Sequence, residues 1–381
     1  MSNKNHIAYL DSIRGLAALA VINEHFVIAY GLPCKDQFCQ RILDYSPLHI
    51  WWDGGAAVSL FFVLSGFVLA LKYFCDTQHP DLNKFQLTSF VIGRLFRIWL
   101  PYVGLVVLSG FLYRYTFETS TLKTELMASD WIISLWRSHP LNFMDMLREA
   151  FLLKLPPLVV LLPQSWTLSI ELVLSLLLPI GLLLAERGLT WLVLFSLFAV
   201  FLLGVSPFLL HFLLGLIIAR HYKQIVDYLS QRTLARSGVL FLGLVLYTSG
   251  NTVPKIVGET LLWLSSGLGA GLIILYVLSS KNTQSVLSNI ILRQMGKVSY
   301  SAYLLHIAVL ICITPYLLST LEFVTLNQQV LWLGGLLLTI VVVQLLACVF
   351  YYVLERPSIN LGRKLLKIKF CRLNPSGNIY G

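Results

Sequence analysis

Apolar stretches of roughly 20 residues recur along the whole chain, with short polar segments between them. About 20 apolar residues in a helix are enough to cross the hydrocarbon core of a bilayer. The pattern therefore predicts an all-α fold, an integral membrane bundle of about ten transmembrane helices. The ten predicted spans are Ala8–Tyr30, Gly55–Phe74, Phe90–Leu112, Trp166–Ala185, Leu189–Leu203, Pro207–Ala219, Ser237–Ser249, Glu259–Ser279, Val298–Leu318 and Val330–Val353.

Composition agrees with a membrane location. Of the 381 residues, 57% are hydrophobic and 12% are charged, and the mean hydropathy is +0.77, whereas soluble domains carry about 25% charged residues. No polar block is long enough to fold separately, so residues 1–357 are predicted as one transmembrane domain and residues 358–381 as a short basic tail. The first apolar run contains charged residues that a cleavable signal peptide would not tolerate, so we expect it to remain as the first span.

The basic residues are distributed unequally between the two predicted sides. The side that holds both termini receives nineteen of the 28 Lys and Arg residues, and the other side eight. Loops rich in Lys and Arg stay in the cytoplasm, so both termini are expected there. The tail is expected to contact anionic membrane lipids. Despite the net charge of +10, the basic residues form no aromatic-interleaved patch, so we expect no nucleic-acid binding.

The longest connection, Tyr113–Gln164, carries apolar residues at near-helical spacing, which predicts external interfacial helices. Cys34 and Cys39 fall in the first external loop, where they would either form a disulfide or remain free thiols. The six cysteines show no C-x-x-C or zinc spacing, so no metal site is expected.

Ionisable side chains within an apolar span are costly unless they are paired or face a wet cavity, so each is a functional candidate. Arg14 and His25 are eleven residues apart in the first span, which places them on one helical face about 16 Å apart. A cation toward the cytoplasm and an imidazole deeper in the bilayer suit an anionic donor whose reactive end reaches a base. The alternative is structural: Asp11 and Arg14 pair at i, i+3, and His25 bonds a neighbouring backbone group.

Further polar residues recur at membrane depth in other spans. Ser65 lies beside Gly66 in the second span, where a small pair favours close helix packing. Arg94 and Arg97 share a predicted face and suit phosphate recognition, with snorkelling as the alternative. Glu171 needs a cationic partner or a functional task, and Arg14 and His25 are both candidates for the partner. A polar stripe on the ninth span consists of Ser299, Tyr300, Tyr303 and His306; its tyrosines also suit an interfacial aromatic belt.

Six motifs in this order resemble the acyltransferase-3 superfamily of multi-pass membrane acyltransferases over nearly the whole chain. They are Leu10-Asp11-Ser12-Ile13-Arg14-Gly15-Leu16-Ala17-Ala18 with His25 at R-x10-H spacing, Phe61 to Phe67, Arg94-x-x-Arg97-Ile98 before Pro101-Tyr102, Ser165-Trp166-Thr167-Leu168-Ser169-Ile170-Glu171, Gly296-x-x-Ser299-Tyr300-x-x-Tyr303-Leu304-x-His306, and Tyr352-x-x-Glu355-Arg356-Pro357. The chain departs from the family after Glu171, where Leu172-Val173-Leu174 replaces the acidic or aromatic residues that members often carry.

The resemblance implies an O-acyltransferase of the bacterial inner membrane. It implies a donor acyl-CoA, usually acetyl-CoA, that binds from the cytoplasm, no permanently bound cofactor, and an acceptor hydroxyl of a carbohydrate or lipid-linked glycan at the outer side. Carried over by motif position, Arg14 and His25 are the essential pair, with His25 as the base, and Glu171 or Asp11 orients it. Arg94 and Arg97 correspond to the donor-phosphate motif. The predicted substrate-binding residues are Asp11, Ser65, Tyr300, Tyr303 and His306.

Two other functions compete with this interpretation. A transporter or flippase for a glycan or lipid would also line its pathway with polar residues, but it would more often show internal repeats or broken helix pairs in matching halves. A catalytically inactive acyl-CoA sensor would not need both Arg14 and His25. The sequence leaves open the acceptor, the acyl chain, the oligomeric state, and direct transfer versus an acyl-enzyme relay.

Overall fold

The computed structural model describes residues 8–34, 36–74, 79–82, 85–114, 128–137, 141–152, 161–249, 259–324 and 327–373. Every regular element in these ranges is helical, which confirms the all-α prediction for them. Parts of the predicted Tyr113–Gln164 loop and residues 374–381 of the predicted tail lie outside the described residues.

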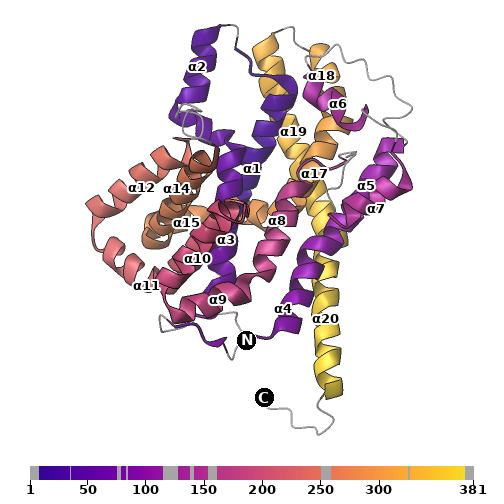
Figure 1. Cartoon of the computed structure of the whole chain (residues 1–381). Helices are drawn as coiled ribbons and strands as arrows, with labels where there is room; N and C mark the ends of the chain where they lie inside the picture. The colour runs from indigo at the N-terminus through magenta and orange to yellow at the C-terminus, as the bar shows by residue number, and fades with distance from the viewer. Residues whose placement is uncertain are drawn as a thin grey trace.

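The helical segments follow one another in the order shown in Figure 1. They are α1 (Ala8–Tyr30), α2 (Gln37–Tyr45), η1 (Pro47–Trp51), α3 (Gly54–Leu71), α4 (Leu87–Arg94), η3 (Leu95–Trp99), α5 (Leu100–Leu112), α6 (Asp130–Arg137), α7 (Phe143–Ala150), α8 (Ser165–Leu176), α9 (Leu178–Arg187), α10 (Leu189–Phe201), α11 (Phe208–Ser230), α12 (Thr233–Tyr247), α14 (Glu259–Ser279), α15 (Lys281–Leu287), α16 (Ile290–Lys297), α17 (Ser299–Cys312), α18 (Thr314–Glu322), α19 (Gln328–Phe350), η6 (Tyr351–Glu355) and α20 (Arg356–Leu373).

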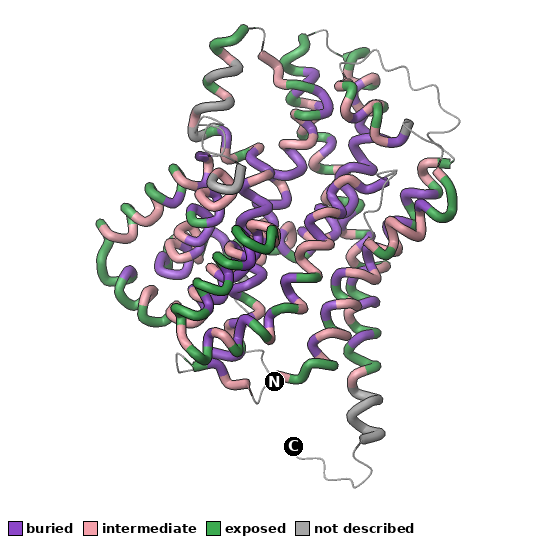
Figure 2. Tube along the Cα trace, in the orientation of Figure 1, coloured by how far each residue is buried: buried purple, intermediate pink, exposed green. Residues whose placement is uncertain are grey.

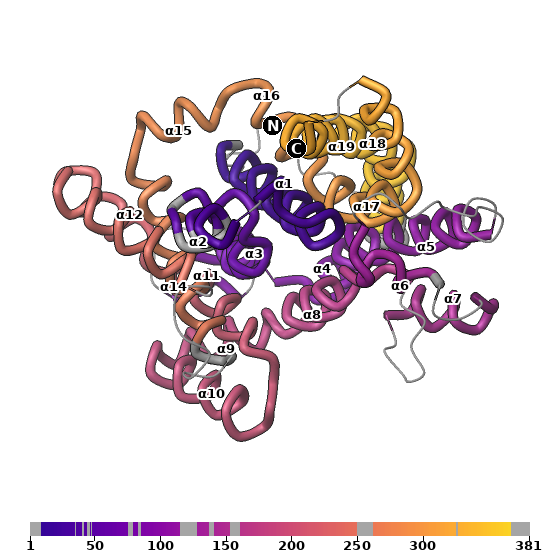
Figure 3. The backbone as a smooth tube through the Cα atoms, turned by 90° about the horizontal axis from the view of Figure 1, so that it is seen from above, coloured from indigo at the N-terminus to yellow at the C-terminus, as the bar shows by residue number. Residues whose placement is uncertain are grey.

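Helices α1, α3 and α17 form the buried centre of the bundle. Figure 2 shows buried residues concentrated along these helices, whereas α12 at the periphery carries many exposed residues. Seen from above in Figure 3, α11, α12 and α14 lie on one side of α1, and α17, α18 and α19 lie on the other. Both groups of helices therefore enclose α1, the helix on which the sequence predicts the essential pair.

Glycines let the central helices approach each other at backbone distance. A Cβ atom at Gly66 of α3 would lie 1.9 Å from the carbonyl oxygen of Phe212 in α11. In return, a Cβ atom at Gly215 would lie 2.1 Å from the carbonyl oxygen of Val63. The predicted packing role of the small pair is therefore confirmed for Gly66, because only a residue without a side chain fits this crossing.

Within the part of the chain that the structure describes, five helical stretches are long and apolar enough to cross a membrane, and up to seven if each of two bent pairs is one span. The prediction of about ten spans is not confirmed. Helix α10 has 13 residues and α12 has 15, which correspond to about 20 and 22 Å. Both lengths are below the bilayer core of about 30 Å. Helix α11 is longer, but its second half is polar.

Two of the predicted spans are broken. The fourth bends by 46° between α8 and α9, where Pro179 occupies the first turn of α9. Proline lacks the amide hydrogen that a continuing helix requires. The ninth ends at Cys312, before Pro315 starts α18, and α16 meets α17 at 70°. The helix that carries Glu171 thus ends at one of these bends, and the helix that carries Tyr300 begins at the other.

The last predicted span is much longer than the sequence indicates. A single helical stretch runs over residues 328–366, through α19, η6 and α20, so the proposed domain boundary after residue 357 lies within a helix. From Val330 onward, the exposed side chains of α19 are apolar and recur along one face, as expected for a lipid-facing stripe. They are Val330, Leu333, Leu337, Leu338, Val341, Leu345, Leu346 and Val349.

The described part of the Tyr113–Gln164 connection contains two short helices, α6 and α7, in agreement with the helices predicted there. Asn142 and Asp145 start α7 through a reciprocal capping box. Between α1 and α3, Cys34 and Cys39 form a disulfide, which selects one of the two states that the sequence left open.

Candidate functional site

A cavity of about 370 Å³, here called the central cavity, lies where α1, α3, η3, α8, α17, η6 and α20 meet. Eight of the ten predicted site residues line it: Asp11, Arg14, Ser65, Arg94, Arg97, Glu171, Tyr300 and Tyr303. The remaining two, His25 and His306, are not among its lining residues. Residues from all six sequence motifs thus meet at one cavity.

Asp11 and Arg14 form an ion pair within the first turns of α1. The distance between Arg14 Nη1 and Asp11 Oδ1 is 2.8 Å, and the two side chains are 19% and 26% exposed. This is the i, i+3 pair that the structural alternative predicted, but it lines the cavity instead of a closed helix interface. The pair keeps a guanidinium at the cavity wall at a low electrostatic cost.

Glu171 is held by Arg94 and Ser65. Its Oε1 atom lies 2.9 Å from Arg94 Nη2 and accepts a hydrogen bond of 3.3 Å from Ser65 Oγ. The ion-pair partner of Glu171 is therefore Arg94 and neither of the two candidates named from the sequence, although Arg14 also interacts with this carboxylate electrostatically. A charge-assisted bond to the buried Arg94 fixes the carboxylate at the wall of the cavity. His25 does not line this cavity, so this position of Glu171 does not support the role of orienting His25 by direct contact.

Arg94 and Arg97 do not present equivalent groups to the cavity. Arg94 is 7% exposed and engaged with Glu171, whereas Arg97 is exposed. The predicted shared face assumed an α-helix, but Leu95–Trp99 is a π-helical turn, in which Leu100 N–H bonds to the carbonyl of Leu95 five residues earlier. This wider turn changes the angular relation between positions 94 and 97 from that of an α-helix, and such turns are frequent at functional sites.

Two tyrosines of α17 form part of the cavity wall. Tyr300 donates a hydrogen bond of 2.6 Å to the carbonyl oxygen of Ile98, which joins α17 to η3. The hydroxyl of Tyr303 lies 2.6 Å from Thr167 Oγ1, and its ring meets Phe61 edge-on at 6.0 Å. Both tyrosines are therefore fixed by specific partners, which an interfacial aromatic belt would not require.

His306 and His25 lie beyond Tyr303. The His306 ring is 5.6 Å from the Tyr303 ring and 4.9 Å from the His25 ring. Nδ1 of His306 is 2.6 Å from the Tyr303 carbonyl, and Nδ1 of His25 is 2.9 Å from the Val21 carbonyl. A carbonyl oxygen only accepts, so in each neutral ring Nδ1 carries the proton and Nε2 has the free lone pair. Each histidine thus has the tautomer of a base.

The two residues of the predicted essential pair have different surroundings. Arg14 lines the central cavity, whereas His25 is partly exposed outside its lining and stacks near Trp131 at 5.7 Å. Tyr303 and His306 lie between the cavity and His25. The Tyr303 side chain thus separates the central cavity from the histidine pair.

Three further charged residues line the cavity and were not predicted as site residues from the sequence. They are Lys297, Glu355 and Arg363. Glu355 accepts a hydrogen bond from Ser301 and is 5% exposed. It belongs to a quoted motif, so the signal was present, but the two cations resembled ordinary positive-inside residues.

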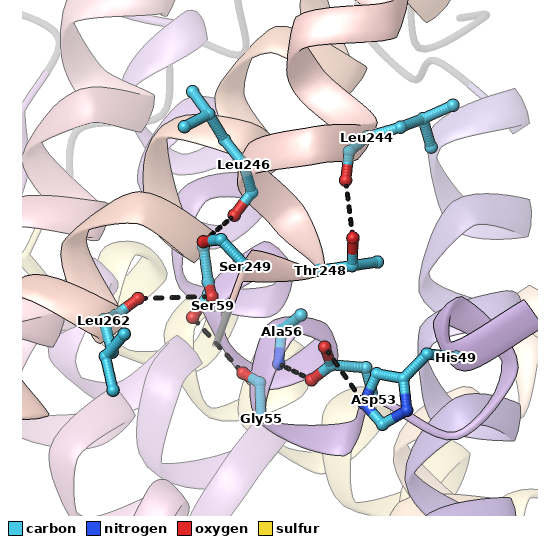
Figure 4. A network of polar contacts seen from close by, with 11 residues as sticks. His49, Asp53, Gly55, Ala56, Ser59, Leu244, Leu246, Thr248, Ser249 and Leu262 are labelled. Atoms are coloured by element: carbon cyan, nitrogen blue, oxygen red, sulfur yellow. Dashed lines mark hydrogen bonds and ion pairs between the residues drawn. The ribbon is translucent and has the colours of Figure 1, made fainter. Parts of the chain in front are cut away.

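A second polar cluster lies at the His25 end of α1. Figure 4 shows Asp53 Oδ1 accepting from Ala56 N–H at 2.8 Å, as the N-cap of α3, and Asp53 Oδ2 facing His49 Nε2 at 3.6 Å. Burial raises the pKa of the Asp53 carboxyl. Glu24, the neighbour of His25, accepts backbone hydrogen bonds from Gly54 and Gly55. The cluster anchors α1 to the start of α3.

The fold and the site define a helical membrane protein with a cavity rich in paired and unpaired cations, next to two basic histidines. The chain matches the acyltransferase-3 family model, described as an acyltransferase domain, over residues 7–348, and so it belongs to this family of acyltransferases. No curated protein and no solved structure matches the chain.

Proposed function

We propose that the protein transfers an acyl group, acetyl in the first instance, from cytoplasmic acyl-CoA to a hydroxyl group of a carbohydrate or related acceptor at the outer side of the inner membrane. The observation that carries the proposal is the central cavity. In a member of an acyltransferase family, this cavity is lined by Arg14, further cations and Tyr303. The Tyr303 ring contacts His306, and the His306 ring contacts His25. A polyanionic donor with a long neutral arm fits such a cavity.

The donor occupies the cavity with its phosphates toward the exposed Arg97 and its thioester toward Tyr303. The apolar wall of Val58, Phe61 and Leu69 accommodates the uncharged arm. Arg94, originally expected to bind the diphosphate together with Arg97, instead holds Glu171 through the 2.9 Å ion pair. The proposed role of Arg94 is to neutralise the carboxylate of Glu171 at the buried end of the cavity.

His25 acts as the general base. Its Nδ1–H is donated to the Val21 carbonyl, so Nε2 is available to accept the proton of the acceptor hydroxyl. The hydroxyl oxygen attacks the thioester carbonyl carbon, the C–S bond breaks, and the imidazolium returns the proton to the departing CoA thiolate. The His306 ring lies 4.9 Å from the His25 ring, and its Nε2 atom has no hydrogen-bond partner. On this mechanism His306 is close enough to exchange a proton with His25. This direct route needs one base and no acyl-enzyme.

The enzyme is tested by thioester consumption with purified protein in proteoliposomes. With water in place of the acceptor hydroxyl, the wild-type protein is expected to cleave acetyl-CoA to CoA and acetate, whereas a transporter or flippase would leave the thioester intact. His25→Ala should lower the rate by about 100-fold or more, the usual contribution of general-base catalysis. His221→Ala, a histidine of α11 outside the central cavity, is the matched control and should retain activity.

The acceptor class is tested in cells. Surface glycans from a deletion strain should be lighter by one acyl unit in mass spectrometry, and the mass should return with the wild-type gene but not with His25→Ala. Full acylation by His25→Ala would reject the base assignment. A deletion that leaves every glycan mass unchanged would reject the carbohydrate acceptor.

A further inference from the structure

The central cavity carries more positive charge than its own carboxylates neutralise. Five cationic and three carboxylate side chains line it, an excess of two positive charges. Arg14 is paired with Asp11, and Arg94 with Glu171. The three other cations, Arg97, Lys297 and Arg363, are all exposed. Exposed side chains that line a cavity lie at its opening, and we call these three residues the cationic rim.

Specific contacts of η3 with α20, and of the end of α16 with η6, assemble the cationic rim. A Cβ atom at Gly362 would lie 2.8 Å from Cβ of Phe96, so α20 packs on η3 one residue before both Arg363 and Arg97. Ser358 donates a hydrogen bond to the Phe96 carbonyl one turn earlier in α20. The positions of the two arginines are thus set by backbone packing, not by flexible side chains alone.

Lys297 joins the rim from the end of α16. Its Nζ atom donates a hydrogen bond of 2.9 Å to the hydroxyl of Tyr352 and lies over the rings of Tyr351 and Tyr352. An ammonium group has three N–H donors, so two remain for a ligand. Among the described residues, no ion pair involves Arg97, Arg363 or Lys297, although all three line the same cavity.

We propose that the cationic rim binds the phosphate groups of the nucleotide thioester donor, and that the C-terminal helix α20 thereby completes the donor site. The inference rests on the proposed function. Residues 349–373 lie beyond the family match at 7–348, so membership of the family does not assign this role to Arg363. Two guanidinium groups and an ammonium at one opening suit the planar, bidentate recognition and point-charge binding of phosphate oxygens.

The central test compares Arg363→Ala with Lys364→Ala in steady-state kinetics on acetyl-CoA. Arg363→Ala should raise KM about tenfold or more, as expected for the loss of a charge-assisted contact to phosphate. Lys364 is also exposed and basic but does not line the cavity, so Lys364→Ala should retain the wild-type KM. Arg363→Lys keeps the charge and folding contacts, and its KM should fall between the two.

A competition assay identifies the group that is recognised. Adenosine 3′,5′-bisphosphate should compete with acetyl-CoA in the wild-type protein, and Arg363→Ala should weaken this inhibition by the same factor as it raises KM. Adenosine without phosphates should not compete. Absence of competition by the bisphosphate, or equal KM values for Arg363→Ala and Lys364→Ala, would overturn the proposal.

An anionic lipid headgroup presents the same phosphate chemistry, so the assay is run in two kinds of nanodisc. The effect of Arg363→Ala on KM should be the same in pure phosphatidylcholine and in discs with added phosphatidylglycerol. An effect that appears only with phosphatidylglycerol would assign the rim to a headgroup and reject the donor site. If the wild-type protein consumes no thioester, the proposed function fails; normal consumption with an unaltered Arg363→Ala variant rejects the rim alone.

Discussion

Replacing Gly296 by Ala tests whether the contact between α1 and α16 positions the site. A Cβ atom at residue 296 would lie 2.2 Å from the carbonyl oxygen of Asp11 and 2.7 Å from the amide nitrogen of Ser12. On the other side, a Cβ atom at Gly15 would lie 2.7 Å from the Gly296 nitrogen. Backbone atoms cannot rotate away, so the helices must separate by about 1 Å to restore van der Waals contact.

The expected cost has a structural and a catalytic part. Forcing a methyl group into a packed contact costs about 1–3 kcal/mol of stability. The separation also moves the Asp11–Arg14 pair relative to the other cavity residues, and a misplacement of about 1 Å can reduce turnover by about 100-fold. The loss of activity should therefore exceed what the small loss of stability explains.

Acetyl-CoA consumption and thermal unfolding in detergent measure the two parts separately. Gly238→Ala is the matched control, because no atom lies within 4 Å of the added Cβ in α12; alanine there should be neutral or slightly stabilising. Wild-type turnover in Gly296→Ala would refute the reasoning, since it would mean that the Asp11–Arg14 pair tolerates displacement.

Three further substitutions test individual contacts. Glu171→Gln leaves the buried Arg94 without its carboxylate, and thermal unfolding should show a loss of about 2 kcal/mol, below the full cost of a broken buried pair because the Glu171 side chain is 30% exposed. Tyr303→Phe removes the hydrogen bond of 2.6 Å to Thr167 and should lower the free energy of unfolding by about 1 kcal/mol. Acetyl transfer should fall by more than this loss of stability explains, because the tyrosine orients the thioester on the proposed mechanism; a fall in transfer no larger than the loss of folded protein would exclude that role. Serine at both Cys34 and Cys39 should cost at most about 2 kcal/mol, because the disulfide closes a short loop, and should leave CoA release unchanged; a loss of turnover would contradict a purely structural role.

The elements that depend on local sequence were predicted well. The first span was predicted as Ala8–Tyr30, and α1 has these bounds, because a long apolar run has no alternative but to form a helix in lipid. The ninth span was predicted as continuous although Pro315 was visible in the sequence. A window of about 20 residues averages hydropathy over a helix break and cannot detect it.

Long-range pairings were less accessible to sequence reasoning. The Asp11–Arg14 pair follows from i, i+3 spacing, but Arg94 and Glu171 are 77 residues apart, and the choice of partner depends on how α4 and α8 cross. The π-helical turn that separates Arg94 from Arg97 has no clear composition signal. The cationic rim was missed for a related reason, since Arg363 joins the cavity only because α20 continues the last span without a break.

The arrangement along α1 explains why one helix would carry both halves of the proposed reaction. Arg14 and His25 are about 16 Å apart along the axis, and Tyr303 and His306 lie between the cavity and the imidazole. On the proposed mechanism, a charged donor can therefore bind without exposing His25 to the opening at the cationic rim, and only its neutral arm needs to pass the Tyr303 ring. The acceptor hydroxyl then meets His25 from the Trp131 side, where the imidazole is partly exposed. On this proposal the barrier between the two substrates consists of side chains on α17, so their rotation, and not a movement of whole helices, admits the thioester to the base.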